Sequence, residues 1–218
     1  MKKVKVLLAG LSLVGAFVIA CETGVANITA VGDGYVCTHG YHTFGDYVLK
    51  SGVSNQYYLI EKTLYSMPNS TKYGLMISKA AGDWSSTSTK VSVSQIYEND
   101  SRTPVYRFYR DVTFEKRVFA RTYFYKSLTL PSQKLAIVDG HLNSDYEWVH
   151  IGLNCSAIDD YSNSIPDVAS IAAHEFGHAF GLTHRNTVPS SIMCQFGHNR
   201  TAKVPSTSDQ ISVNHLYK

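Results

Sequence analysis

The feature that most constrains this chain is residues 165–184, which read IPDVASIAAHEFGHAFGLTH. Ser164 and Asp167 stand in the S-x-x-D relation of a helix capping box, and Pro166 falls in the first turn, where no N–H group is needed. Apolar side chains then follow around most of the circumference, which is typical of a helix that is buried on nearly every side. The stretch therefore predicts a buried helix that begins near residue 165.

Two histidines and one glutamate interrupt this apolar helix. His174 and His178 are four residues apart, so both imidazoles lie on one face and can reach a single ion. Gly181 suits a left-handed helix end and lets the chain turn, so that His184 approaches the other two. Three neutral imidazoles leave a tetrahedral zinc ion with one open position, which is a catalytic arrangement. Glu175 points aside from the helical histidines, where it can hold a water on the metal rather than bind the metal itself.

These motifs resemble those of a known clan. Residues 174–184, HEFGHAFGLTH, resemble the extended zinc motif of the metzincin metalloproteases, and residues 191–193, SIM, resemble the methionine turn of that clan. The sequence HEFGHAFGL is most similar to the matrixins, and residues 205–218 resemble the end of small bacterial matrixin-like domains. The resemblance spans roughly residues 55–218. It implies an α+β fold of metzincin type, with a twisted, mostly parallel sheet, one antiparallel edge strand, and packed helices that include the zinc-binding helix.

The resemblance also implies an activity, that of an exported zinc endopeptidase acting on a protein or peptide substrate. His174, His178 and His184 would hold one catalytic Zn²⁺, which lowers the pKa of its water to about 7. Glu175 would be the general base and then the general acid, and Met193 would form the floor of the site without binding the metal. The alternative is a zinc-holding but catalytically weak surface lipoprotein or adhesion module, against which the intact Glu175 argues. We expect a monomer.

Two positions depart from the family patterns. Arg185 stands where matrixins usually carry serine, which leaves the subfamily open. Gln195 stands where astacins and serralysins carry a switchable tyrosine ligand, so those two subfamilies are disfavoured.

The amino-terminal residues indicate export. Residues 1–20 have a basic start and an apolar run that is short for a membrane span and suited to a secretory signal. Residues 18–21, VIAC, resemble the lipobox of bacterial lipoproteins, in which Cys21 would carry a lipid anchor. Plain cleavage near residue 20, 26 or 30 is the alternative. We therefore expect a secreted or cell-surface protein, with a leader or short pro-segment at 21–54 and the catalytic domain at 55–218.

The charge balance disfavours polyanionic partners. The full chain has 20 basic and 17 acidic residues, and removal of residues 1–20 takes away three lysines, which leaves 17 of each. No run of like charge is long enough to act as a binding arm. We therefore expect no nucleic-acid partner.

The cysteines leave several alternatives open. Without Cys21, the remaining Cys37, Cys155 and Cys194 allow three single disulfides, each with one thiol left over. A Cys37 thiolate that caps the zinc as an inhibitor is a further alternative, although the surrounding YVCTHGYH does not match the matrixin switch motif.

The remaining elements follow from hydrophobic periodicity. Strands are expected at 56–59, 91–97, 105–112, 118–125 and 148–154, and helices at 69–84 and 209–216, with a polar connection at 159–163. In the first of these helices, the expected apolar side includes Leu75, Met76 and Ala80. Residues 102–126 hold seven basic and two acidic residues. We favour basic side chains that blunt an exposed sheet edge over an edge that binds acidic substrates.

Two further groups of residues invite a metal hypothesis. Asp139, His141, Asp145 and His150 could form a second, structural metal site of the kind that the resemblance implies, but their spacing does not match closely. Polar residues in a solvent-facing turn are the favoured interpretation. His198 lies near the methionine turn and is expected to be exposed.

Overall fold

A computed structural model describes residues 28–30, 35–37, 40–87, 89–115, 118–129, 133–138 and 140–218. The expected signal segment, Cys21, the side chain of Cys37 and Asp139 lie outside this described part. No helix in the described ranges is long and apolar enough to cross a membrane. A short antiparallel pair, β1 (Ile28–Ala30) and β2 (Tyr35–Cys37), precedes the main sheet.

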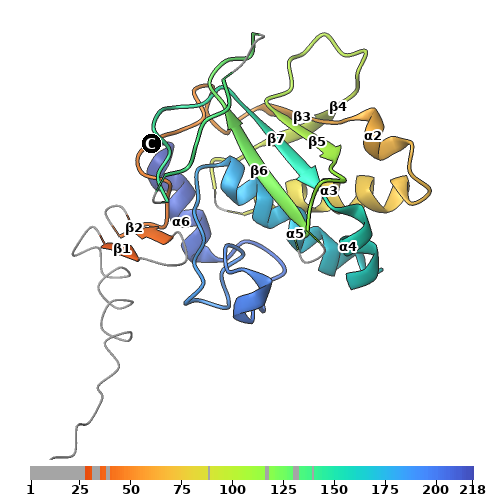
Figure 1. Ribbon diagram of the computed structural model, residues 1–218. Helices are drawn as coiled ribbons and strands as arrows, with labels where there is room; N and C mark the ends of the chain where they lie inside the picture. The colour runs from red at the N-terminus through yellow and green to blue at the C-terminus, as the bar shows by residue number, and fades with distance from the viewer. Residues whose placement is uncertain are drawn as a thin grey trace, which may run out of the picture.

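The main sheet has five strands in the order β4-β3-β5-β7-β6 (Figure 1). The strands are β3 (Gln56–Ile60), β4 (Val93–Ile96), β5 (Tyr106–Arg110), β6 (Ala120–Tyr125) and β7 (Trp148–Leu153). The first four in this order are parallel to one another, and β6 runs antiparallel to β7 at the edge. This confirms the predicted α+β class and the antiparallel edge strand.

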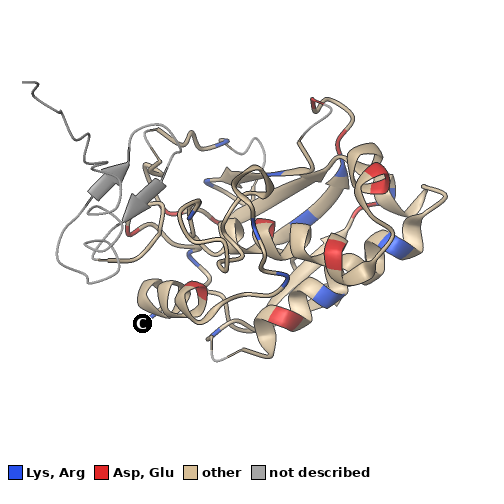
Figure 2. Ribbon diagram, turned by 90° about the horizontal axis from the view of Figure 1, so that it is seen from below, with Lys and Arg blue, Asp and Glu red and all other residues tan. Residues whose placement is uncertain are grey.

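Helices cover one face of the sheet. They are α2 (Lys62–Tyr65), α3 (Ser70–Ser85), α4 (Cys155–Tyr161), α5 (Ile165–Ala179) and α6 (Thr207–Leu216), with a 3-10 turn η1 (Phe196–His198). The long helices α3 and α5 pack against each other beneath the sheet (Figure 1). Basic and acidic residues are interspersed along the helices on the lower side, as the neutral charge balance leads one to expect (Figure 2).

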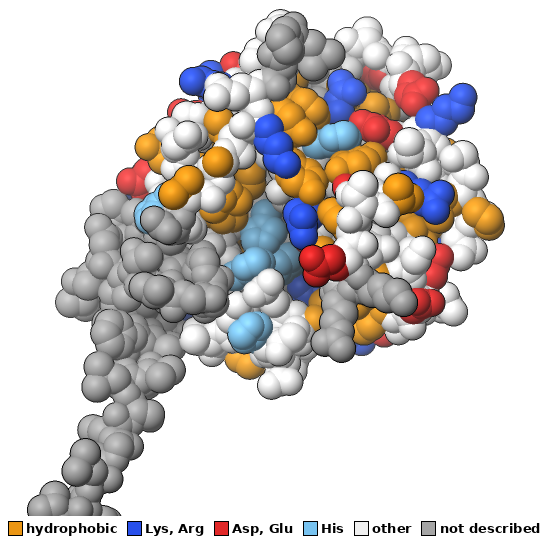
Figure 3. Space-filling view, viewed as in Figure 1, with side chains coloured by type: hydrophobic (Ala, Val, Ile, Leu, Met, Phe, Trp, Pro, Cys, Tyr) orange, Lys and Arg blue, Asp and Glu red, His pale blue; other side chains and the backbone are white. Residues whose placement is uncertain are grey.

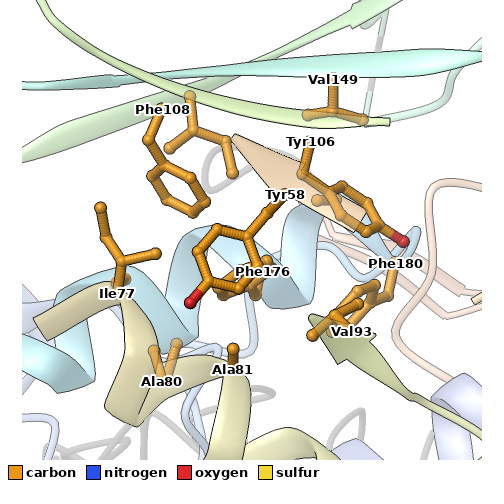
Figure 4. Close-up of a cluster of buried hydrophobic side chains, with 14 of the residues drawn as sticks. Tyr58, Ile77, Ala80, Ala81, Val93, Tyr106, Phe108, Val149, Phe176 and Phe180 are labelled. Carbon is orange, nitrogen blue, oxygen red and sulfur yellow. The ribbon is translucent and has the colours of Figure 1, made fainter. Parts of the chain in front are cut away.

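The core fixes how α5 is rotated about its own axis. Phe176 lies edge-on to Tyr58, Tyr106 and Phe108 of the sheet, with ring centroids 5.1 to 6.0 Å apart (Figure 4). Phe180 packs one turn later, and both rings are fully buried. Burial of each such side chain stabilises the fold by about 1.5–3 kcal/mol, so this face of α5 is held against the sheet. His174 and His178 consequently face away from these strands.

The structure corrects two expectations about helices. In α3, Leu75 is 53% exposed, and the buried stripe follows a 3.6-residue repeat through Tyr73, Met76, Ile77, Ala80, Ala81 and Trp84. The expected polar connection at 159–163 is wrong because residues 155–161 form α4 directly after β7. The Asn154 side chain caps α4 by accepting a hydrogen bond from the Ala157 N–H group.

The predicted capping box is found at a different helix. α5 begins at Ile165 as expected, but the Ser164 side chain accepts no cap hydrogen bond, and Asp167 pairs with Lys203 instead. The capping box occurs at α6, where Ser206 and Asp209 exchange side-chain and backbone hydrogen bonds.

Part of the expected leader lies inside the domain. Phe44, Leu49 and Val53 are buried in the same core as the sheet. The Phe44 N–H group donates to the carbonyl of Gly181 at 2.9 Å, so this segment pairs with the turn that follows α5. The boundary at residue 54 stays a prediction about maturation, while residues 41–53 pack as part of the folded domain.

Candidate metal centre

Three imidazoles converge at the end of α5. One ring nitrogen from each of His174, His178 and His184 lies within 4.8 Å of the others. The Nε2 atoms of His178 and His184 are 3.2 Å apart. Histidine side chains gather in a hollow on this face of the molecule (Figure 3). In the described ranges these three residues are the group that could hold a metal ion, as their spacing predicts.

The turn after α5 brings His184 into this group. Gly181 has a φ of +94°, which is the left-handed conformation expected for it. A Cβ atom at this position would also lie 2.8 Å from the Leu216 side chain. Both observations explain why glycine stands at the helix end.

The protonation states suit metal binding. The Nδ1 atom of His174 lies 2.7 Å from the Ile192 carbonyl oxygen, and that of His178 lies 2.8 Å from the Leu182 carbonyl oxygen. Since a carbonyl only accepts, each Nδ1 carries the proton and each Nε2 keeps its lone pair for a metal. Burial lowers the pKa of His174 well below its usual value and that of His178 to about 3, so both are neutral.

The donor set fits zinc. It consists of nitrogen atoms only, and three imidazoles with an open fourth position are a known catalytic zinc arrangement. Neutral rings lose no proton when they bind the ion, and the carbonyls behind them fix their orientation.

Glu175 directly follows His174 in the chain and is not a member of the nitrogen cluster. Its side chain is buried, and Oε2 accepts a hydrogen bond of 2.6 Å from the Thr122 hydroxyl on β6. Burial raises the pKa of Glu175 to about 7, while Thr122 and the positive charges of Arg200 and Arg121 act in the opposite direction. A carboxylate with a pKa near neutrality can both take up and release a proton in this range.

Met193 packs directly against the active-site helix. It is fully buried, and a Cβ atom added to Gly177 would lie 2.2 Å from its sulfur. Glycine at 177 is therefore required for the close approach of this turn to α5.

The buried carboxylate of Asp209 supports the methionine turn. The sequence had indicated only that Asp209 begins the last helix. Asp209 is fully buried and accepts hydrogen bonds from the Ile192 N–H group at 2.9 Å and from the Ser191 hydroxyl. It also lies 3.1 Å from Nε2 of His42. Because the Ile192 carbonyl accepts from His174, Asp209 is linked through the single residue Ile192 to an expected metal ligand.

Arg200 contacts the carbonyl group of the same residue, Ile192, and was also missed. Its guanidinium donates to the Ile192 carbonyl and to the Ser170 hydroxyl, each at 3.1 Å, and lies 3.8 Å from the centre of the Phe196 ring. Neither residue could be assigned to the site from the sequence, because Asp209 was indicated only as a helix start and Arg200 belongs to no metal-binding motif.

The second candidate cluster does not assemble in the described part of the chain. Asp145 accepts a hydrogen bond from the Val48 N–H group, and His150 lies 3.1 Å from a carboxylate oxygen of Glu61. His141 forms an isolated β-bridge with Val138. The described residues therefore do not support a second metal site, and Asp139 is not among them.

The structure also bears on the expectations for the cysteines, His198 and Gln195. Cys155 and Cys194 are buried free thiols, so none of the three candidate disulfides forms, and burial raises the pKa of Cys155 to about 11. Cys155 is the first residue of α4, and Cys194 directly follows Met193. His198 is exposed, as expected. The Gln195 side chain bonds with Asn186, which keeps it within its own loop.

Comparisons with known proteins agree with this geometry. The family model described as Matrixin, peptidase M10, matches residues 52–218. The comparison with curated proteins gave no match. A solved structure titled "GM1 bound form of the ECX AB5 holotoxin" is 14% identical with a TM-score of 0.50, and the match covers 79% of this chain and 84% of that one. That likeness concerns the fold alone. The family match covers most of the chain and includes the three converging histidines, and this chain belongs to the matrixin family of zinc metallopeptidases.

Proposed function

We propose that the protein is an exported endopeptidase that hydrolyses peptide bonds with Glu175 as its proton carrier. The observation that carries this proposal is a buried carboxylate on the residue that follows His174, together with three histidine ring nitrogens that lie within 4.8 Å of one another. Family membership supports zinc metallopeptidase activity in general, and the residue roles are proposed here.

Each residue has a defined task in this proposal. His174, His178 and His184 hold one zinc ion, which when bound lowers the pKa of a water molecule to about 7 and polarises the scissile carbonyl. Glu175 accepts a proton from the attacking water and delivers it to the leaving amine. Met193 packs beneath the histidines and keeps the site floor apolar, with no bond to the metal.

The sheet edge offers a place for the substrate. Residues 133–135 pair with the end of β6 near Phe124 and Lys126, so within the described chain residues 120–123 form the outer edge next to Glu175. We propose that an extended peptide pairs with this edge through main-chain hydrogen bonds. The basic side chains here still have the simpler interpretation of blunting an exposed edge.

The decisive experiment replaces Glu175 with glutamine. Loss of the carboxylate should lower peptide hydrolysis at least 10²- to 10⁴-fold, while zinc content and folding stay near wild type because the imidazoles are untouched. If the wild-type protein and Glu175→Gln are equally inactive toward a broad set of unfolded proteins, with zinc bound and any leader removed, the endopeptidase proposal fails. A zinc-holding binding module would then take its place.

Export is a separate proposal that rests on residues 1–21. If VIAC is a lipobox, the mature protein should partition with membranes, and Cys21→Ser should abolish its lipid modification. Mass spectrometry of the mature amino terminus distinguishes the alternatives, because an unmodified terminus at Glu22 or beyond means plain secretion.

A further inference from the structure

The edge strand supplies a side chain to the catalytic carboxylate. The Thr122 hydroxyl lies 2.6 Å from Oε2 of Glu175 and 3.3 Å from the carbonyl oxygen of the same residue. A hydroxyl has a single proton, and the shorter contact assigns it to the carboxylate. Both side chains are buried, at 9% exposure for Thr122 and 5% for Glu175, so water does not compete freely for this bond.

The sheet register fixes where this hydroxyl points. Thr122 pairs with Ile151 of β7 and lies on the inner face of β6, two residues before the fully buried Phe124. This inward-facing position would otherwise suit an apolar side chain. Because Thr122 occupies it, a hydroxyl group lies against α5. A β-branched residue is also restricted in χ1, so the Thr122 hydroxyl has few alternative directions.

We propose that Thr122 is a positioning residue of the reaction, which holds Oε2 of Glu175 so that Oε1 is left to exchange the proton. This inference rests on the proposed function and assigns a role to a residue outside the zinc motif. A glutamate side chain has three rotatable bonds, and a fixed hydrogen bond at one oxygen removes most of that freedom before the substrate arrives. The Thr122 side chain therefore acts through Glu175 and contacts neither substrate nor metal, whereas substrate pairing at this edge uses the main chain.

The location on β6 gives the role a kinetic signature. Thr122 belongs to the outer-edge residues to which we assign substrate pairing, but its side chain points inward, away from that edge. Its loss should therefore leave substrate affinity nearly unchanged and lower the rate of the chemical step. A defect in packing alone would instead lower stability or zinc content.

The test compares two substitutions at one position. Thr122→Val removes the hydroxyl and keeps the shape, and kcat should fall about 10- to 100-fold with KM within about twofold. Thr122→Ser keeps the hydroxyl and should restore most of kcat. Zinc content and thermal midpoint are measured on every variant. The matched control is Thr113→Val, because the Thr113 hydroxyl donates to a carboxylate oxygen of Asp111 at the same distance of 2.6 Å, away from the metal centre.

The outcomes separate this inference from the proposed function. An inactive wild-type protein contradicts the endopeptidase proposal itself. Active wild type, inactive Glu175→Gln and a Thr122→Val variant with wild-type kcat would overturn the positioning role alone. If Thr122→Val does not fold, Thr122→Ala takes its place. Equal losses in Thr122→Ser and the hydroxyl-free variant would likewise overturn the role, since the hydroxyl would then not matter.

Discussion

Two regions of this chain combine histidine with acidic residues, and only one of them forms a convergent site in the described structure. At the end of α5, three ring nitrogens lie within 4.8 Å of one another. In the second candidate cluster, His150 of β7 and Asp145 of the preceding loop are instead engaged with Glu61 and the Val48 N–H group. The two regions are similar in composition, so composition does not decide where a metal binds.

The difference lies in what holds the side chains. The interval between His174 and His178 is one turn of a helix whose opposite face is packed by Phe176 and Phe180, so both rings are aimed before any ion arrives. The described residues of the second cluster come partly from the loop before β7 and partly from β7 itself, and each finds its own hydrogen-bond partner. The spacing of candidate metal ligands in the sequence is therefore informative when they lie on one regular element, because that element fixes the distance between their side chains.

The largest effect should come from removing a ligand. His178→Ala should reduce zinc affinity more than 100-fold, because even the loss of a residue that only orients a ligand costs about 10- to 100-fold. His150→Ala is the control from the second cluster and should keep full zinc content. Elemental analysis of chelator-free protein checks both variants. Zinc loss in His150→Ala alone would show that the second cluster, and not the end of α5, binds the metal.

Removal of the supporting carboxylate should have the next largest effect. Asp209→Asn places an amide among hydrogen-bond donors and disturbs the peptide that orients His174, so zinc affinity should fall about 10- to 100-fold. Competition with a zinc chelator measures this change. An affinity equal to wild type would show that the methionine turn does not need Asp209 to orient the ligand.

The same carboxylate predicts a specific response to acid. Burial alone would raise the pKa of Asp209, but hydrogen bonds from His42, Ser191 and Ser206 lower it to about 2. The stability that it contributes is present above about pH 4 and is lost as the pH falls toward 2, by about 2 kcal/mol. Burial also lowers the pKa of His42, so that group adds to acid destabilisation below about pH 6.5.

Urea unfolding of the metal-free protein between pH 6 and pH 2 provides the measurement. Wild type should lose stability relative to Asp209→Asn mainly between pH 4 and pH 2. Parallel curves for the two proteins across this range would contradict a lowered pKa at Asp209.

The smallest effect is expected in the second candidate cluster, at His150 of β7. His150 and Glu61 are partly exposed, and such a pair contributes at most about 1 kcal/mol. His150→Ala and Glu61→Gln should each change the free energy of unfolding by no more than this amount. If either substitution lowered the free energy of unfolding by several kcal/mol, or lowered it only in the presence of zinc, the second cluster would have a role in metal binding.

Sequence reasoning was strongest where local spacing determines geometry. The active-site helix, the left-handed Gly181, the five strands and the convergence of the three histidines all followed from periodicity and motif. Thr122 and Asp209 were missed as parts of the site because their contacts span 53 and 17 residues, which no local pattern encodes. Arg200 was missed because a single arginine near the methionine turn belongs to no metal-binding motif. The short helix α4 was missed because seven residues carry too little periodic signal.

X-ray absorption at the zinc edge of the zinc-loaded full chain tests the central claim most directly. We expect three imidazole nitrogens and one oxygen at about 2.0–2.1 Å from the zinc ion. The oxygen would belong to a water molecule at the position that no protein ligand takes. A sulfur neighbour at about 2.3 Å would mean that a cysteine such as Cys37 closes the site. That result, or a shell with fewer than three imidazoles, would contradict a catalytic zinc centre built from His174, His178 and His184.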